Sequence, residues 1–473
     1  MEVNLKFSTV ANKFKYTNKN ALIWLINYLI QKKKYSMLIF LVLLNIKEKN
    51  NGKDRRFFSS PSNKITILAL DSDRYRGDLE VLSFHKGLRV LFMKQNPPGW
   101  LIKPFYSGQR IEKYLNSKKN SNDAINHKKA YKFMYWFLHR FYQYVSVDCV
   151  TTVNYRYIED FNWTKASDKL GVPFIMMYRE CLLASDRIYD DVVFRSKKFG
   201  KFHGSHIIVH NKKCKQMFID SGYAPIDMIS IVSPMRMSSF FKLLKQNNSK
   251  VGQSVNNKKT FVLFYFPCNL GMFGKKINSS EVINKYKYSA KIWINREKLF
   301  IDLHHAIIEL AEEYPDIEFI IKPKKVMVKN KSWKIYEEAV DKSKVNAITL
   351  SNYRVDENLD VNEGIINSSV ICALQSSVVL ESAIAGKRLI FPLFHNYLDS
   401  PHLDDFFWRD DMELFDVATS KNEFKKLFQD IISNPGVSVG IQDKRKQLFE
   451  KWFNSMESNS LDECYNIIEN ITQ

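Results

Sequence analysis

Short apolar runs alternate with longer amphipathic stretches along most of this chain. The runs have the length and the β-branched and aromatic content of buried strands. The predicted strands cover residues 64–71, 88–95, 147–154, 172–180, 205–211, 228–236, 259–267, 317–323, 346–351, 369–376 and 388–394. Apolar positions recur at helical spacing in residues 124–146, 157–171, 212–222, 296–314, 377–386, 421–433 and 443–470. Strands that alternate with helices in this way predict parallel sheets covered by helices.

The alternation occurs twice, on either side of a polar stretch. We therefore predict an α/β protein with two doubly wound, Rossmann-like domains that face a cleft, where ligands lie at the carboxyl ends of strands. The expected divisions are residues 1–60 (a basic, apolar helical segment), 61–241 (the first domain), 242–258 (a linker), 259–435 (the second domain) and 436–473 (C-terminal helices).

The N-terminal segment contains two ten-residue apolar runs, at residues 21–30 and 37–46, separated by a lysine-rich turn. Neither run has the roughly 18–20 residues of a membrane-spanning helix, and no small-residue cleavage site follows them. Residues 1–60 carry a net charge of +9. Two interpretations stay open: helices that bind an anionic membrane surface, or a helical hairpin packed on the first domain. The polar residues 50–63 predict a linker.

Composition adds a charge bias and excludes little else. The chain has 71 Lys and Arg against 50 Asp and Glu, a net charge of +21, with 45% hydrophobic residues. Such a chain attracts anionic partners such as nucleotides, acidic lipids or acidic glycans. We do not predict nucleic-acid binding, since lysine-rich composition alone accounts for much of the excess. The six cysteines are widely separated, which indicates buried thiols in a reducing compartment and no metal site.

The most informative stretch is residues 372–396. It predicts a strand, a turn with Ser376 and Ser377, a helix with Glu381 near its start, and a second strand. The start of a helix presents free N–H groups and positive potential, which suit a phosphate. Glu381 could then bind ribose hydroxyls. The alternatives are that a serine only caps the helix and that Glu381 only interacts with its dipole.

Three further residues are candidates for nucleotide binding. Lys322 ends a very apolar predicted strand and could face a diphosphate or remain solvated. Asn269 lies in a loop after the first strand of the second half, where the glycine spacing matches no nucleotide fingerprint. Arg236 follows a strand near the boundary of the halves, and could hold a phosphate or brace the hinge.

Two carboxylates are candidates for the catalytic base. Glu180 ends the predicted strand 172–180, and Asp160, with Glu159 beside it, follows another strand end. Removal of a proton from an acceptor requires a carboxylate or imidazole whose pKa is raised by burial. The alternative for Glu180 is an ion pair with Arg179 or Arg236.

A family resemblance is found in five segments of the chain: residues 320–323, 375–392, 172–180, 206–211 and 229–236. The chain resembles bacterial GT-B glycosyltransferases of surface-carbohydrate and capsule biosynthesis, a group that includes CDP-glycerol glycerophosphotransferases. The likeness spans about residues 60–440. The chain departs from the family pattern at Lys324, where related sequences often have a histidine after Lys-Pro.

The resemblance implies a cytoplasmic transferase, peripheral on the inner face of the cell membrane. It would move a sugar, or a polyol-phosphate, from a nucleotide donor to a surface glycan or lipid-linked acceptor. It implies no cofactor and no bound metal, since cations and helix dipoles can stabilise the departing phosphate. The alternatives are a sugar-nucleotide epimerase of the same fold and a non-catalytic scaffold at a membrane surface.

Overall fold

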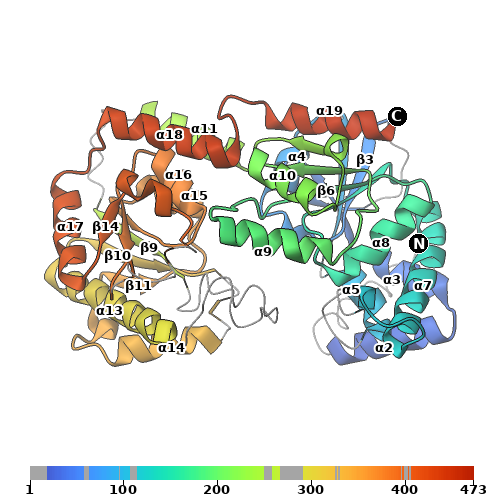
Figure 1. Ribbon diagram of the computed structural model, residues 1–473, viewed down its shortest axis with the longest axis horizontal. Coiled ribbons are helices and arrows are strands. Elements are labelled where there is room, and N and C mark those ends of the chain that lie inside the picture. The colour runs from blue at the N-terminus through green and yellow to red at the C-terminus, as the bar shows by residue number, and fades with distance from the viewer. Residues whose placement is uncertain are drawn as a thin grey trace. The chain divides into compact units, whose positions relative to one another are not determined.

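The computed structural model forms two compact units, each built on one helix-covered sheet (Figure 1). Unit 1 comprises Met1–Cys181, Val193–Ser238 and Glu457–Gln473, and unit 2 comprises Leu182–Val192 and Ser239–Met456. The structure describes residues 19–57, 63–94, 96–106, 114–249, 258–266, 291–324, 327–328, 331–395, 397–398, 403 and 406–473.

Unit 1 has an eight-stranded sheet in the order β2-β1-β4-β3-β5-β6-β7-β8. Strands β3 to β8 are parallel, and β1 is antiparallel to both β2 and β4. The strands are β1 (Ile46–Asn50), β2 (Lys53–Arg56), β3 (Ile65–Ala69), β4 (Leu88–Met93), β5 (Cys149–Thr152), β6 (Phe174–Met177), β7 (His206–Val209) and β8 (Ile229–Ile231). Because β3 pairs with both β4 and β5, the strand order changes direction between β3 and β5. Ligands of open α/β sheets bind at the carboxyl ends of strands at such a point.

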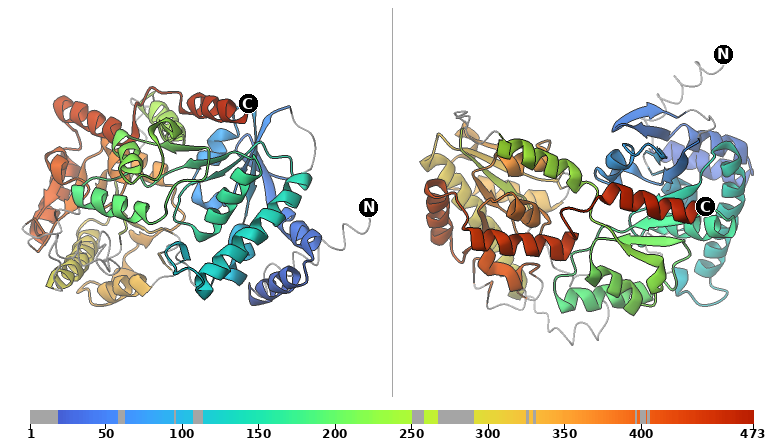
Figure 2. Two further views of the ribbon diagram at one scale, coloured as in Figure 1. Left: turned by 45° about the vertical axis from the view of Figure 1, so that its right-hand side comes forward. Right: turned by 90° about the horizontal axis from the view of Figure 1, so that it is seen from above.

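Helices cover both faces of this sheet (Figure 2). They are α2 (Lys19–Gln31), α3 (Tyr35–Leu43), η1 (Ser72–Arg74), α4 (Asp78–Leu82), α5 (Pro97–Ile102), η2 (Lys103–Phe105), α7 (Asn122–Tyr144), α8 (Ile158–Lys169), α10 (Lys212–Asp220), η3 (Ile226–Met228) and α19 (Ser460–Thr472). Helix α9 (Asp186–Lys197) contains the division between the units. The last helix, α19, joins the core of unit 1, where Cys464 and Ile468 pack with Ile67 and Val90.

Unit 2 has a six-stranded parallel sheet in the order β11-β10-β9-β12-β13-β14. The strands are β9 (Thr260–Phe264), β10 (Glu318–Lys322), β11 (Tyr353–Val355), β12 (Val370–Cys372), β13 (Leu389–Pro392) and β14 (Asp416–Ala418). The helices are α11 (Met237–Ser249), α13 (Lys291–Glu313), α14 (Lys331–Asp341), η5 (Ala347–Thr349), α15 (Val361–Asn367), α16 (Val378–Ile384), η7 (Arg409–Leu414), α17 (Lys421–Ser433) and α18 (Val439–Phe453). In chain order this is the 3-2-1-4-5-6 arrangement of a Rossmann sheet.

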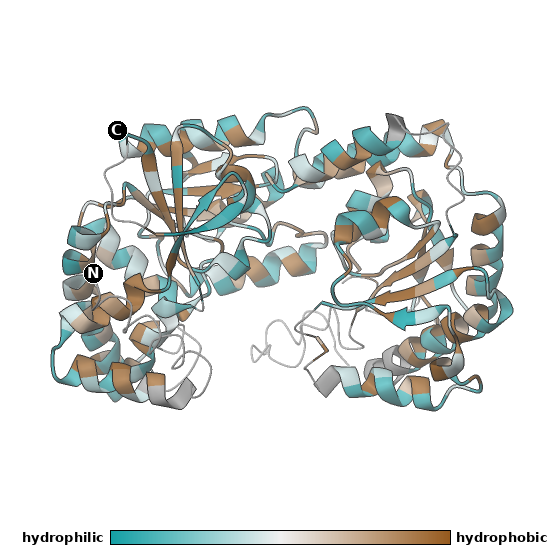
Figure 3. Ribbon diagram, turned by 180° about the vertical axis from the view of Figure 1, so that it is seen from behind, coloured by the Kyte–Doolittle hydropathy of each residue, from teal (hydrophilic) through white to brown (hydrophobic). Residues whose placement is uncertain are grey.

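The predicted α/β class with two doubly wound sheets is confirmed. Figure 3 shows apolar residues concentrated on the strands of both sheets, as expected for strands with helices on both faces. The strand predicted at residues 346–351 is wrong. Residues Ala347–Thr349 form the 3₁₀ helix η5, because the Asn346 side chain accepts a hydrogen bond from the Ile348 N–H (3.1 Å). The strand at this edge, β11, begins only at Tyr353.

Two other polar stretches are more ordered than predicted. Residues 46–56, expected in part as helix and in part as linker, form the β1–β2 hairpin. Asn51 (φ 46°) and Gly52 (φ 76°) make its turn, and an Asn-Gly pair with positive φ is a strong local signal for a two-residue hairpin turn. Residues 242–249 of the expected linker belong to helix α11.

The predicted N-terminal helices are present as α2 and α3. Among the described residues, no helix combines the length and apolar character needed to cross a membrane. Five of the cysteines are buried free thiols; Cys268 lies outside the described residues.

Candidate functional site

In unit 2 the strand order changes direction between β9 and β12. The segment after β12 therefore lies at this switch point, and it contains Gln375, Ser376 and Ser377 before helix α16. Two hydrogen bonds from residues later in the chain hold this segment in place. Phe407 N–H donates to Gln375 Oε1 (3.0 Å), and Trp408 Nε1–H donates to the Leu374 carbonyl (3.0 Å).

The two serines of this turn differ in their contacts. Ser376 Oγ accepts a hydrogen bond from the Val378 N–H (3.4 Å), whereas Ser377, in the capping position, makes no side-chain cap. Both serines are half-buried. A hydroxyl not used as a cap, at the carboxyl end of a central strand, could contact a ligand. Helix α16 has only seven residues. The dipole of a helix favours an anion only near its first turn.

The other nucleotide-binding candidates that the structure describes lie on separate elements of the two units. Glu381 is in α16 and only 7% exposed. Lys322, at the end of β10, donates from Nζ to the carbonyls of Pro323 (2.9 Å) and Glu357 (3.0 Å), so backbone oxygens hold its ammonium. Arg236 belongs to unit 1, where its N–H donates to Asp78 Oδ1 (3.1 Å). Asn269 lies outside the described residues.

Glu180, the first candidate for the base, follows β6 and is exposed. Its charge interacts with Arg156 and Arg179. The ion pair of Arg179 is with Asp78 (3.6 Å), and its Nη1 donates to the Arg74 carbonyl. Glu180 is therefore open to water and is not enclosed in a site.

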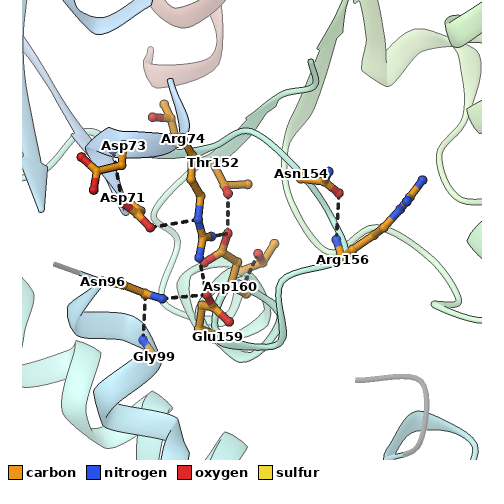
Figure 4. Close-up of polar contacts among 12 residues, drawn as sticks. Asp71, Asp73, Arg74, Asn96, Gly99, Thr152, Asn154, Arg156, Glu159 and Asp160 are labelled. Atoms are coloured by element: carbon orange, nitrogen blue, oxygen red, sulfur yellow. Dashed lines mark hydrogen bonds and ion pairs between the residues drawn. The ribbon is translucent and has the colours of Figure 1, made fainter. Parts of the chain in front are cut away.

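Asp160, the second candidate, belongs to a cluster at the switch point of unit 1 (Figure 4). The loop after β3 supplies Asp71 and Arg74, and the first turn of α8, which follows β5, supplies Glu159 and Asp160. Three carboxylates surround one guanidinium. Arg74 Nε lies 2.9 Å from Asp71 Oδ2, Nη1 lies 3.2 Å from Asp160 Oδ2, and Nη2 hydrogen-bonds Glu159 Oε1.

Neighbouring polar and aromatic groups position this cluster. Asn96, at the start of α5, donates from Nδ2 to Glu159 Oε1 (2.9 Å), and Thr152, at the end of β5, donates to Asp160 Oδ2. The guanidinium of Arg74 lies 3.4 Å from the centre of the Tyr157 ring. Asp160 is only 3% exposed, and among the described residues its Oδ1 has no hydrogen-bond partner.

The electrostatics of the cluster bring the titration of Asp160 close to neutral pH. Burial raises the pKa of Asp160 to about 7; Glu159 and Asp71 add to this rise, while Arg74 and Thr152 oppose it. Burial also raises the pKa of Asp71. Burial by itself lowers the pKa of Arg74, but the carboxylates outweigh it, so the guanidinium stays charged. A carboxyl that titrates near 7 can accept or donate a proton at physiological pH.

Asp160 also lines a cavity of about 20 Å³, together with Thr152, Asn154, Lys201 and His203. This volume holds roughly one water molecule and no sugar ring. A water there could relay a proton between Asp160 and a ligand. Burial lowers the pKa of His203, which favours the neutral form of its imidazole. Within the described residues, no group of three or more His, Cys, Asp or Glu side chains could hold a metal ion.

Sequence analysis found Glu159 and Asp160 but missed Asp71, Arg74 and Asn96. Asp71 is the last residue of the predicted strand 64–71, so the strand-end argument used for Asp160 could have identified it. No pattern in the sequence pairs Arg74 with residues more than 80 positions later in the chain.

No protein-family model and no curated protein matches this chain. It is similar to solved structures, among them UDP-GlcNAc 2-epimerase from Neisseria meningitidis bound to UDP-GlcNAc (11% identity, TM-score 0.46, covering 86% of this chain and 100% of that one). Another is a UDP-forming α,α-trehalose-phosphate synthase from Burkholderia vietnamiensis (7% identity, TM-score 0.46, covering 86% of this chain and 100% of that one). Structural similarity at this identity and TM-score does not identify the activity of this chain.

Proposed function

We propose that this protein transfers a sugar, or a related polyol-phosphate unit, from a nucleotide donor to a surface glycan or lipid-linked acceptor. The observation that carries the proposal is the Rossmann strand order of unit 2, with the half-buried Ser376 and Ser377 at its switch point. The two serine hydroxyls at the carboxyl end of the sheet support a phosphate-binding role for this turn.

In this proposal unit 1 binds the acceptor and supplies the base. Asp160 suits this role better than the exposed Glu180, because burial raises the pKa of Asp160 to about 7. The carboxylate would take the acceptor proton through one water in the adjacent cavity. Lys322, Glu381 and Arg236 stay proposals as donor-binding residues, as does Asn269. A lipid-linked acceptor would place the protein at the inner face of the cell membrane.

Nucleotide binding tests the donor half of this proposal. Thermal unfolding would be measured with CMP, CDP, UDP and GDP for three proteins: the wild type, Ser377→Asp and a control, Ser343→Asp. Ser343 is a half-buried serine of unit 2 that lies outside the switch point. The new carboxylate of Ser377→Asp favours the helix start but repels a phosphate. We expect a nucleotide to stabilise the wild type and the control, but not Ser377→Asp. An equal nucleotide shift in all three proteins contradicts the proposed site.

One observation favours a second candidate, a sugar-nucleotide epimerase. Such an enzyme abstracts a proton from the sugar and therefore needs several carboxylates together. Asp71, Glu159 and Asp160 meet this requirement around Arg74.

A further inference from the structure

Helices α2 and α3 of unit 1 expose large apolar side chains. Trp24 and Tyr28 lie one turn apart on α2, with their rings stacked at 5.7 Å between centroids, and they are 67% and 45% exposed. Met37 and Phe40 lie one turn apart on α3 and are 58% and 44% exposed. Of the thirteen large hydrophobic residues exposed in the described part of the chain, these four fall within residues 24–40.

The exposure does not come from poor packing of the two helices. Each helix buries a second apolar face, formed by Ile26, Leu29, Leu38, Ile39 and Val42. Helix α3 is also connected to α7 by the contact of the Tyr35 and Phe133 rings and by Arg140 over the Tyr35 ring. The exposed aromatic and apolar side chains therefore lie on two packed helices, and large apolar side chains that are exposed within one short segment are typical of an interaction surface.

Three exposed lysines, Lys32, Lys33 and Lys34, join the two helices. Their backbone is ordered: Lys32 N–H donates to the Tyr28 carbonyl (2.9 Å), and Lys34 N–H donates to the Leu29 carbonyl (2.8 Å). No acidic residue occurs between Lys19 and Ile46. Helix-end lysines can simply complement the helix dipole. That role accounts for one cation near α2 but not for three beside four exposed apolar side chains.

We propose that Trp24, Tyr28, Met37 and Phe40, with Lys32, Lys33 and Lys34, form a surface that docks on an anionic lipid bilayer. Trp and Tyr favour the bilayer interface, where their apolar rings insert and their polar atoms stay hydrated. Lysines complement the negative charge of lipid headgroups. A protein partner fits less well, because the buried part of protein interfaces is depleted in lysine.

This inference deepens the proposed function, since a lipid-linked acceptor lies in a membrane. It rests on different residues. The surface lies in unit 1, and the nucleotide site in unit 2. The two proposals can therefore fail independently.

The test is co-sedimentation of the full chain with vesicles of phosphatidylcholine alone, or with a third of the lipid replaced by phosphatidylglycerol. We expect binding to the anionic vesicles that falls as salt rises, and little binding to the neutral ones. Each lysine near a membrane surface contributes roughly fivefold in affinity, so replacing Lys32, Lys33 and Lys34 together by serine should weaken binding about 100-fold.

The matched control replaces Lys426, Lys444 and Lys446, three exposed lysines of unit 2, by serine. It loses the same charge, but it should bind as the wild type does, because these lysines lie outside the docking surface. Trp24→Ser with Phe40→Ser should weaken binding roughly tenfold. Thermal unfolding and nucleotide shifts should be unchanged in all variants.

Equal losses in the two triple-lysine variants would overturn the proposal, because they would show that only total charge matters. Binding that is indifferent to Trp24 and Phe40, or equal on neutral and anionic vesicles, would also overturn it. Normal vesicle binding without a nucleotide shift in the wild type would instead count against the proposed function and leave the docking surface supported.

Discussion

Asp160 is the residue on which the acid–base chemistry of this protein should depend. Burial raises its pKa to about 7, so it is half-ionised at neutral pH. A base must be ionised to accept a proton. We therefore expect the rate of donor turnover with acceptor to rise between about pH 6 and 8, with a midpoint near 7. Asp160→Asn should lower kcat by about 10²–10⁴ and remove this rise. A variant that keeps the same pH profile would rule out Asp160.

The same pKa predicts an unusual effect on stability. In the unfolded chain Asp160 ionises near the ordinary aspartate value of 3.8, whereas in the folded protein its pKa is about 7. Between these values the folded state holds a proton that the unfolded state has lost, so stability falls as pH rises and then levels off above pH 7. The loss is at most about 4 kcal/mol.

Asp160→Asn should remove this pH dependence. His203 and His210, whose pKa values burial lowers, act in the opposite direction in part of the same range. The measurement is therefore the difference between wild type and variant in urea unfolding at pH 5 and pH 8. We expect Asp160→Asn to gain stability relative to the wild type at pH 8. A difference that does not change with pH would show that Asp160 does not titrate between the two.

Sequence analysis identified the cluster around Asp160 only in part, for a physical reason. Glu159 and Asp160 follow the buried strand β5, and parallel strands gather the residues that follow them at one edge of the sheet. Arg74 lies in the short 3₁₀ helix η1 after β3, its partners Glu159 and Asp160 follow β5, and Asn96, which donates to Glu159, follows β4. Only the strand order, β4-β3-β5, shows that these loops meet.

Among the elements, α19 makes the least expected contribution. It is the last helix of the chain, yet it packs on strands of unit 1, and Ile468 is fully buried there. Ile468→Ala should lower the free energy of unfolding by about 2–5 kcal/mol, because it leaves a cavity in the core. Asn466→Ala, at an exposed position of the same helix, should change it by less than about 0.5 kcal/mol. Urea unfolding of both variants checks this, and equal effects would contradict the packing of α19.

Long apolar strands were predictable and short edge strands were not. Strands β3, β4, β9 and β10 are almost wholly buried, and continuous burial produces an apolar run that the sequence shows directly. Strand β11 has three residues, two of them exposed, and its neighbour η5 carries the more apolar sequence. At such edges a local cap such as Asn346 decides the conformation.

At the scale of the whole chain, each of the two sheets has its own switch point. Unit 2 has two serine hydroxyls at its switch point, while unit 1 has three carboxylates and an arginine there. The first set suits an anionic phosphate and the second suits proton transfer. An enzyme that performs the proposed transfer from a nucleotide donor requires both functions.

Whether that enzyme is a transferase or an epimerase depends on what the carboxylates deprotonate. A transferase removes a proton from an acceptor hydroxyl, and the carbon-bound hydrogens of the sugar stay in place. An epimerase removes a hydrogen from a sugar carbon, and solvent can replace it. We therefore expect that, in D₂O with a sugar nucleotide and no acceptor, mass spectrometry detects no deuterium in the recovered sugar. Deuterium that enters with the wild type but not with Asp160→Asn would instead establish the epimerase, because only abstraction from carbon exchanges that hydrogen with solvent.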